Sequence, residues 1–249
     1  MSAPTSSPVI RRLLWENVGW MWVCLIGITL ISRIDAAEPS DYLSNTNQHS
    51  LFTGNMPAGV IAATKQRLTP RPQPPYYQPV QFVGPKGTEF SLAQYGTFPE
   101  GQPDLMAGLL VGQVYRFRVS NLPGAAGAEL YPTVEMVDRT FPPPGLATSY
   151  PVPINLDEDD IFAALEGRLV TRVVFLEDPQ TAVPLAQGPD GPVAIDVPEY
   201  QDPLQIADLR GRVVAILRIG SVSPPQAEVL QHQFYFGHPS WAPIFEPQP

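Results

Sequence analysis

The sequence predicts a mainly β protein built as an antiparallel β-sandwich, and three observations favour this fold class. Short runs rich in Val, Ile, Phe and Tyr alternate with Gly- and Pro-containing turns over residues 80–220. A single segment, about 157–166, has a strong helix pattern, so strands and helices do not alternate as they would in a parallel α/β fold. Proline accounts for 31 of the 249 residues, which argues against a helix bundle because proline interrupts helices. A mixed α+β sheet is the alternative.

The clearest strand lies within residues 108–121. Apolar side chains alternate there with Arg116 and Arg118, and the side chains of a strand point alternately to its two faces. One face of this strand should therefore be buried and the other should face solvent. Further strands are expected at residues 80–83, 89–95 and 130–138.

The second half of the domain contains an edge strand, the helix and two core strands. Residues 150–156 have proline at every second position, which suits the edge of a sheet because proline has no N–H to donate. The helix at about 157–166 begins with a run of acids, which favour the positive end of the helix dipole. Residues 168–177 and 212–219 are dense in Val, Ile and Leu and should be core strands. About seven strands joined by turns are typical of an immunoglobulin-like sandwich.

The two ends of the chain differ in composition from residues 80–220, which we expect to be a single domain. Residues 1–37 carry two arginines, then an apolar run, then Ala36-Ala37, as in an export signal. This segment is interpreted as a cleaved signal peptide or as an N-terminal membrane anchor formed by residues 13–31. We therefore expect an exported protein of the cell envelope or the secreted fraction. Residues 38–79 form a Pro-rich linker and residues 221–249 a Pro- and aromatic-rich tail.

The charge balance excludes several classes of partner. Residues 80–220 contain 18 Asp or Glu and 9 Lys or Arg, so this region holds the whole formal charge of −9. An acidic surface repels a phosphate backbone, which excludes nucleic acid. No polybasic run is present to bind anionic lipid, so contact with a membrane is expected only through the N-terminal apolar segment.

Nucleophilic catalysis is not expected, and no catalytic residue is assigned. The three histidines, His49, His232 and His238, all lie outside residues 80–220, and Cys24 is the single cysteine. A Ser-His-Asp or Cys-His arrangement needs a histidine within reach of the nucleophile.

Carboxylates near strand ends leave a carboxylate-based hydrolase as the least favoured function. Two arginines, Arg139 and Arg172, lie nearby and are expected instead to form salt bridges at the rim of the sheet. The carboxylates are those of Glu135, Asp138, Glu177 and Asp178.

The densest acidic run could bind Ca²⁺ through its oxygens, which an exported protein would meet outside the cell. The alternative is that these acids begin the helix at 157–166, and the run lacks the spacing of ligands and the central glycine of an EF-hand loop. No other cofactor is expected. The candidate metal ligands are Asp157, Glu158, Asp159 and Asp160.

Aromatic residues gather in the tail and are the candidate binding residues for a protein partner. Exposed aromatic side chains favour protein–protein contacts, whereas the alternative is that the tail packs on its own domain. The Pro-Pro-Tyr-Tyr run at residues 74–77 offers the same two interpretations. The candidate residues of the tail are Phe234, Tyr235, Phe236, Trp241 and Phe245.

Four stretches of the sequence carry a resemblance to known proteins. They are GLLVGQVYRFRVSNLP (108–123), LYPTVEMVDRTFPPPG (130–145), VPINLDEDDIFAALEGRLVTRVVFLEDPQTA (152–182) and DPLQIADLRGRVVAILRIG (202–220). Together they resemble an uncharacterised family of exported planctomycete proteins over most of residues 54–221. The resemblance implies export and one domain of shared architecture. The family has no established activity, so it implies no catalytic residue.

These observations predict an exported, non-enzymatic module that associates with an envelope protein or with a second copy of itself. A ligand-binding module for calcium or an envelope polysaccharide is the alternative function.

Overall fold

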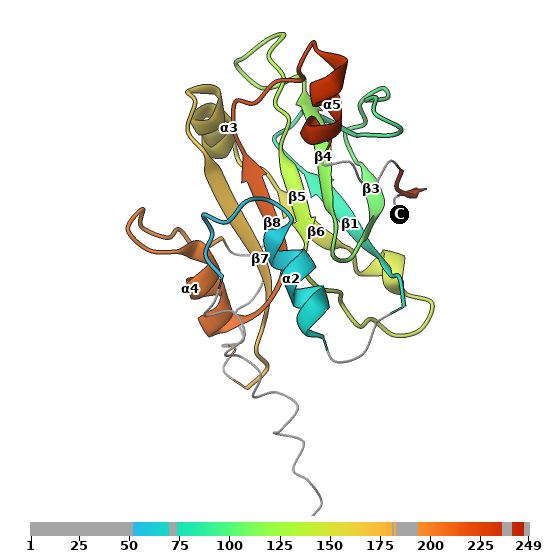
Figure 1. Cartoon of the computed structure of the whole chain (residues 1–249), viewed down its shortest axis with the longest axis vertical. Coiled ribbons are helices and arrows are strands. Elements are labelled where there is room, and N and C mark those ends of the chain that lie inside the picture. Colours follow the sequence, from blue (N-terminus) through green and yellow to red (C-terminus); the bar gives the residue numbers. More distant parts are fainter. Residues whose placement is uncertain (1–51, 70–73, 181, 183–193, 236–240, 247–249) are drawn as a thin grey trace, which may run out of the picture. The chain divides into compact units, whose positions relative to one another are not determined.

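Two β-sheets form the framework of the described part of the chain (Figure 1). The computed structural model describes residues 52–69, 74–180, 182, 194–235 and 241–246. The predicted mainly β class is confirmed, with a sheet of four strands in the order β6-β1-β3-β9 and a sheet of five in the order β2-β4-β5-β8-β7. The N-terminal segment predicted to direct export lies outside the described residues. Within the described ranges, no helix has the length and apolar composition needed to cross a membrane.

The four-stranded sheet contains both antiparallel and parallel pairs. Strand β1 (Tyr77–Val83) is antiparallel to β3 (Met106–Leu110) and parallel to β6 (Val152–Asn155), while β9 (Ile244–Phe245) is antiparallel to β3. The parallel pair corrects the prediction of purely antiparallel pairing. It arises because the chain returns from the five-stranded sheet and enters β6 in the direction of β1. Strand β6, which contains Pro153, occupies the edge of the sheet, as its alternating prolines predict.

The five-stranded sheet is antiparallel throughout. A bulge between Val174 and Phe175 makes the pairing skip Val214. The carbonyl oxygen of Val214 instead accepts hydrogen bonds from the backbone N–H groups of Val137 (2.8 Å) and Asp138 (3.1 Å). The strands are β2 (Glu89–Leu92), β4 (Val114–Ser120), β5 (Thr133–Met136), β7 (Val170–Glu177) and β8 (Gly211–Ile219).

The strand predicted at residues 108–121 is two strands in the structure. Strand β3 ends at Leu110 and β4 begins at Val114, and Gly112 between them has a φ of 91°. Glycine adopts this left-handed conformation without steric cost. At this turn the chain passes from one sheet to the other. The sequence did not indicate the turn because the apolar run continues through it.

The two sheets share one hydrophobic core. The rings of Phe82, Phe90 and Phe117 lie within it, with the Phe82 and Phe117 centroids 4.7 Å apart. Each of these side chains is almost fully buried, and burying such a side chain stabilises the fold by about 1.5–3 kcal/mol. Helix α3 (Glu158–Leu165) adds Ile161 to the same core.

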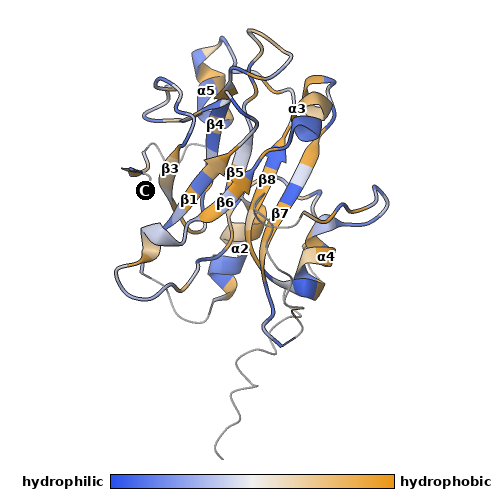
Figure 2. Cartoon of the chain, turned by 180° about the vertical axis from the view of Figure 1, so that it is seen from behind, coloured by the Kyte–Doolittle hydropathy of each residue, from blue (hydrophilic) through white to orange (hydrophobic). Residues whose placement is uncertain are grey.

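A second apolar cluster lies against β8 and is completed by two helices. Helix α2 (Val60–Leu68) contributes Ile61, and helix α4 (Pro203–Arg210) contributes Leu204. Figure 2 shows polar and apolar residues side by side on both helices, as expected for helices with one buried face.

The prediction of a single short helix is corrected by three further helices in the described residues. Helix α3 lies where it was expected, whereas α2 falls within the predicted linker and α5 (Glu228–Phe234) within the predicted tail. Helix α4 was missed because prolines surround it. Its start is nonetheless encoded, since Pro203 occupies the first turn and the Asp202 carboxylate accepts the N–H of Leu204 at 2.9 Å.

A buried ion pair lies beneath α2. The Glu135 side chain is fully buried and that of Arg218 is 9% exposed, with 2.8 Å between Oε2 and Nη1. The other carboxylate oxygen, Oε1, accepts the backbone N–H of Ala62 at 2.8 Å. Arg218 Nη2 donates to the carbonyl oxygen of Met56 at 3.1 Å. The pair therefore joins β5, β8 and the start of α2.

Removing one partner of this pair is expected to destabilise the fold strongly. Arg218→Met or Glu135→Leu should each lower the free energy of unfolding by about 3–5 kcal/mol, because each leaves an uncompensated buried charge. The double variant should cost much less than the sum. Urea unfolding followed by circular dichroism measures the free energy of unfolding of the unmodified protein, the two single variants and the double variant. Additive single effects would contradict the prediction, and Arg168→Met, which breaks the exposed pair with Glu166, is the matched control with a cost below about 0.5 kcal/mol.

Candidate functional site

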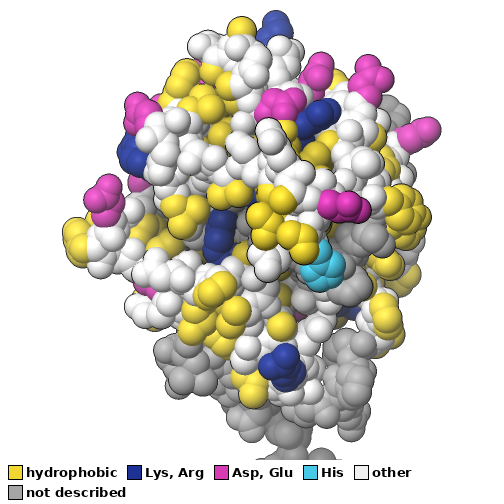
Figure 3. Space-filling model, turned by 45° about the horizontal axis from the view of Figure 1, so that its top comes forward, with side chains coloured by type: hydrophobic (Ala, Val, Ile, Leu, Met, Phe, Trp, Pro, Cys, Tyr) yellow, Lys and Arg dark blue, Asp and Glu magenta, His cyan; other side chains and the backbone are white. Residues whose placement is uncertain are grey.

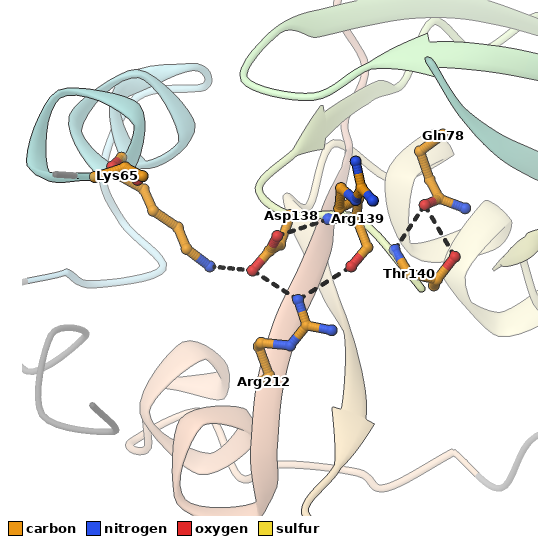
Figure 4. Close-up of polar contacts among 7 residues, drawn as sticks. Lys65, Gln78, Asp138, Arg139, Thr140 and Arg212 are labelled. Carbon is orange, nitrogen blue, oxygen red and sulfur yellow. Dashed lines mark hydrogen bonds and ion pairs between the residues drawn. The ribbon is translucent and has the colours of Figure 1, made fainter. Parts of the chain in front are cut away.

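The segment that leaves β5 carries a group of polar contacts around one carboxylate (Figure 4). Asp138 Oδ2 lies 2.8 Å from Lys65 Nζ of α2 and 2.8 Å from Arg212 Nη1 of β8. Asp138 Oδ1 accepts the backbone N–H of Arg139 at 2.7 Å. Arg212 Nη1 also donates to the carbonyl oxygen of Arg139 at 3.0 Å. One carboxylate thus links a helix, a strand and the following residue.

Thr140, the residue after Arg139, is hydrogen-bonded to the other sheet. Gln78 of β1 is fully buried, and its Oε1 accepts from the backbone N–H (2.7 Å) and the hydroxyl (3.0 Å) of Thr140. Its Nε2 donates to the carbonyl oxygen of Pro79 at 3.0 Å. A buried amide must find such partners, since each one left unmade costs about 1–3 kcal/mol. Both sheets therefore fix the segment that contains Arg139.

Arg139 is held by aromatic rings and not by a carboxylate. Its guanidinium carbon lies 4.4 Å from the centroid of the Tyr76 ring and 4.5 Å from that of Phe141. Arg212 approaches the same Phe141 ring at 5.4 Å. Among the described residues, no carboxylate forms an ion pair with Arg139, and its Nε is buried without an acceptor. The salt bridge predicted for this arginine is therefore replaced by cation–π contacts.

The electrostatics of this group favour the ionised carboxylate. Burial acts to raise the pKa of Asp138, but the Lys65 ammonium and the Arg212 guanidinium outweigh it, and the pKa lies below its ordinary value. Three cationic side chains then surround one anion, which leaves a local excess of positive charge in a domain that is acidic as a whole.

A cavity of about 720 Å³ lies between α2 and the turn before β4. Its walls include Gly59 and Ala63 from the helix side and Gln113 from the turn, and Arg67 is the single charged side chain among the residues that line it. One cation without an acidic or nucleophilic neighbour provides no acid–base pair, so this cavity suggests no reaction.

Within its described residues, the tail contacts the domain at Phe234 and Tyr235 and again at Ala242, whereas nearly all of residues 221–233 are exposed. Phe234 is buried rather than exposed: Arg116 stacks on its ring at 4.2 Å, and the rings of Tyr131 and Tyr235 lie at 5.8 and 5.0 Å. Burial raises the pKa of Tyr131 to about 12, with a further contribution from its hydrogen bond to Glu129. Figure 3 shows the neighbouring surface, on which groups of apolar side chains lie among acidic ones.

The remaining aromatic candidates lie on the other sheet. Trp241 is 45% exposed and meets Tyr77 edge to face at 6.2 Å between centroids. Phe245 belongs to β9, where it pairs with Met106. Phe236 lies outside the described residues. The structure therefore separates Phe234 and Tyr235 from Trp241 and Phe245.

The acidic run forms the start of α3 and is paired with an arginine. Arg172 of β7 binds both oxygens of Asp160 at 2.8 and 2.9 Å and reaches Asp157 at 3.1 Å. These hydrogen bonds raise the pKa of Arg172. Glu158 and Asp159 lie in the first turn without joining this group. In the described part of the chain, no three acidic, histidine or cysteine side chains are grouped as metal ligands, and the calcium site stays a prediction.

Sequence reasoning missed Tyr76, Arg139 and Phe141 as a group. The signals were present but separate, since Tyr76 follows two prolines and Phe141 precedes three. Only the pairing of β1 with its neighbours brings the two prolyl segments together. Arg172 does form salt bridges, but its partners are Asp157 and Asp160 at the start of α3 and not the carboxylates near strand ends that the sequence indicated.

Acid should weaken the contacts of Asp138. Because its folded pKa is lowered, its stabilising effect is complete above the ordinary value near 4 and is lost as the pH falls through the folded value. Asp138→Asn should cost about 1–3 kcal/mol at pH 7 and should flatten the fall in unfolding free energy below about pH 4. Urea unfolding between pH 3 and 6 tests this. Lys65→Met should flatten the same fall in part, and equal slopes in all three proteins would refute the assignment.

Calcium should leave the thermal stability of the full-length protein unchanged, because Arg172 already occupies the oxygens of Asp160. Melting curves with Ca²⁺ and with a chelator are expected to superimpose. A melting temperature that rises by several degrees with Ca²⁺, and does not rise in Asp157→Asn, would support the calcium site. Arg172→Gln, which frees the acids, shows whether the arginine alone prevents binding.

Comparisons with known proteins identify no relative. No protein-family model matches the chain, and no curated protein sequence or solved structure matches it significantly. The resemblance to exported planctomycete proteins stays a prediction.

Proposed function

We propose that this chain is an exported, non-enzymatic module of the cell envelope or the secreted fraction that associates with another protein. The contact surface is the outer face of the four-stranded sheet, around Tyr77, Val83 and Trp241. The N-terminal segment, residues 13–31, provides export or anchoring. An immunoglobulin-like form of the sandwich is part of the same proposal, and the parallel pairing of β1 with β6 is the feature that it must accommodate.

The edge-to-face pair of Tyr77 and Trp241 is the observation that carries the proposal. Val80 and Phe82 of β1 enter the core, so Tyr77 and Val83 face outward and are 38% and 43% exposed. Trp241 is 45% exposed. Large apolar side chains that remain accessible together support a protein contact.

The position of these residues supports the same function. Figure 2 presents β1, β3 and β6 without a helix in front of them, whereas α2 and α4 pack on the five-stranded sheet. Aromatic pairs keep a fixed geometry at little entropic cost, and interfaces are enriched in Tyr and Trp for this reason.

Site-specific photo-crosslinking in the producing cells tests the proposal. A photoreactive residue replaces Val83, which faces the same side as Tyr77 but leaves the aromatic pair intact. We expect one recurrent adduct, and Trp241→Ala should reduce its yield at least several-fold because truncating a buried interface aromatic costs more than about 1 kcal/mol. An adduct of twice the chain mass would identify the partner as a second copy.

The matched control places the same photoreactive residue at Tyr200, which is 85% exposed at a distance in sequence from the proposed surface. The same adducts at positions 83 and 200 would overturn the proposed surface. So would a crosslinking yield at position 83 that Trp241→Ala leaves unchanged. The melting temperature of Trp241→Ala shows whether the variant remains folded.

A further inference from the structure

We propose that Arg139, with Tyr76 and Phe141, forms a binding site for one carboxylate of a partner peptide, an Asp or Glu side chain that stands next to an apolar one. This site uses different residues from the surface around Trp241, so either proposal can fail without the other.

The chemistry of the guanidinium is the first argument. Arginine carries five N–H donors in a planar fork that matches a carboxylate. The Arg139 side chain has no hydrogen-bond acceptor among the described residues, and its contacts are with the Tyr76 and Phe141 rings. Nε of Arg139 is buried and cannot be reached by a ligand, so the two terminal Nη groups are the donors that remain for an acceptor, while the rings hold the π face.

The neighbouring carboxylate cannot neutralise Arg139. Both oxygens of Asp138 are already in use, by Lys65, by Arg212 and by the backbone N–H of Arg139. The Arg139 charge is therefore the one in this cluster that lacks a counter-ion among the described residues. A carboxylate from outside would supply it.

The backbone that presents Arg139 is fixed on both sides. Asp138 ties it to α2 and β8, and Thr140 is bound to the buried Gln78 of β1. A ligand would therefore meet a preorganised site, which lowers the entropic cost of binding.

The surroundings select a peptide rather than an acidic sugar. The polar groups that would bind sugar hydroxyls are engaged, since Gln78 holds Thr140 and Asp138 holds two cations. What remains accessible is Phe141, 68% exposed, which offers apolar contact beside the charge. The domain carries a charge of −9 and so disfavours a polyanion, while a single carboxylate on a mixed segment is tolerated.

Selection of random heptapeptides displayed on phage against the full-length protein tests the proposal. We expect enrichment of sequences with Asp or Glu next to an aromatic or aliphatic residue. The strongest enriched peptide is then titrated by calorimetry beside its counterpart with Gln for Glu or Asn for Asp. The acidic peptide should bind at least about 10-fold more tightly, which corresponds to about 1.4 kcal/mol. Arg139→Met should remove this difference.

The controls separate the site from general charge and from the association surface. Arg168→Met removes an exposed arginine elsewhere, and Trp241→Ala removes the other surface, so both should keep the discrimination. Arg139→Lys keeps the charge without the fork and should retain only part of it. No acidic enrichment, or discrimination that persists in a folded Arg139→Met, would overturn the proposal. Tighter binding of galacturonate than of the peptide, lost in Arg139→Met, would overturn the peptide in favour of a sugar acid.

Discussion

The buried carboxylate of Glu135 determines where helix α2 lies, and the rest of the polar architecture depends on that placement. One oxygen binds Arg218 and the other binds the N–H of Ala62. With the helix start fixed, Lys65 lies one turn further along and reaches Asp138. Charge buried at one point of β5 therefore sets the position of the cation that stabilises the next carboxylate, three residues later in the chain.

Two neighbouring tyrosines place the two proposed surfaces on opposite sides of one strand. Tyr76 turns toward Arg139 and the segment between the sheets, whereas Tyr77 faces outward toward Trp241. Tyr76 comes directly before β1 and Tyr77 is its first residue, and successive side chains of an extended backbone point to opposite sides. A short aromatic dipeptide thus serves two contacts, and a partner bound at one of them approaches from a different direction than a partner at the other.

The sequence predicted those elements whose signals are local. Alternating prolines placed β6 at an edge, dense β-branched runs identified β7 and β8, and the acids at 157–160 marked the start of α3. Long-range features were not predictable, because nothing in β1 or β6 alone requires them to run parallel. The group around Arg139 was not predicted for the same reason. Arg139 stands beside acids in sequence, yet its neighbours in space are rings supplied by both prolyl segments.

The proline at the centre of β6 has a consequence for the behaviour of the protein in concentrated solution. The N–H of Leu156 donates inward to the carbonyl oxygen of Val83, so the alternate residue Pro153 faces away from β1 along the strand edge. A strand added at this edge would lack one hydrogen-bond donor, because Pro153 has no N–H. At the other edge it could pair only with the two residues of β9. Both edges of the four-stranded sheet therefore disfavour edge-to-edge aggregation. Molecules that meet on this sheet must do so through side chains, which favours discrete complexes over fibres.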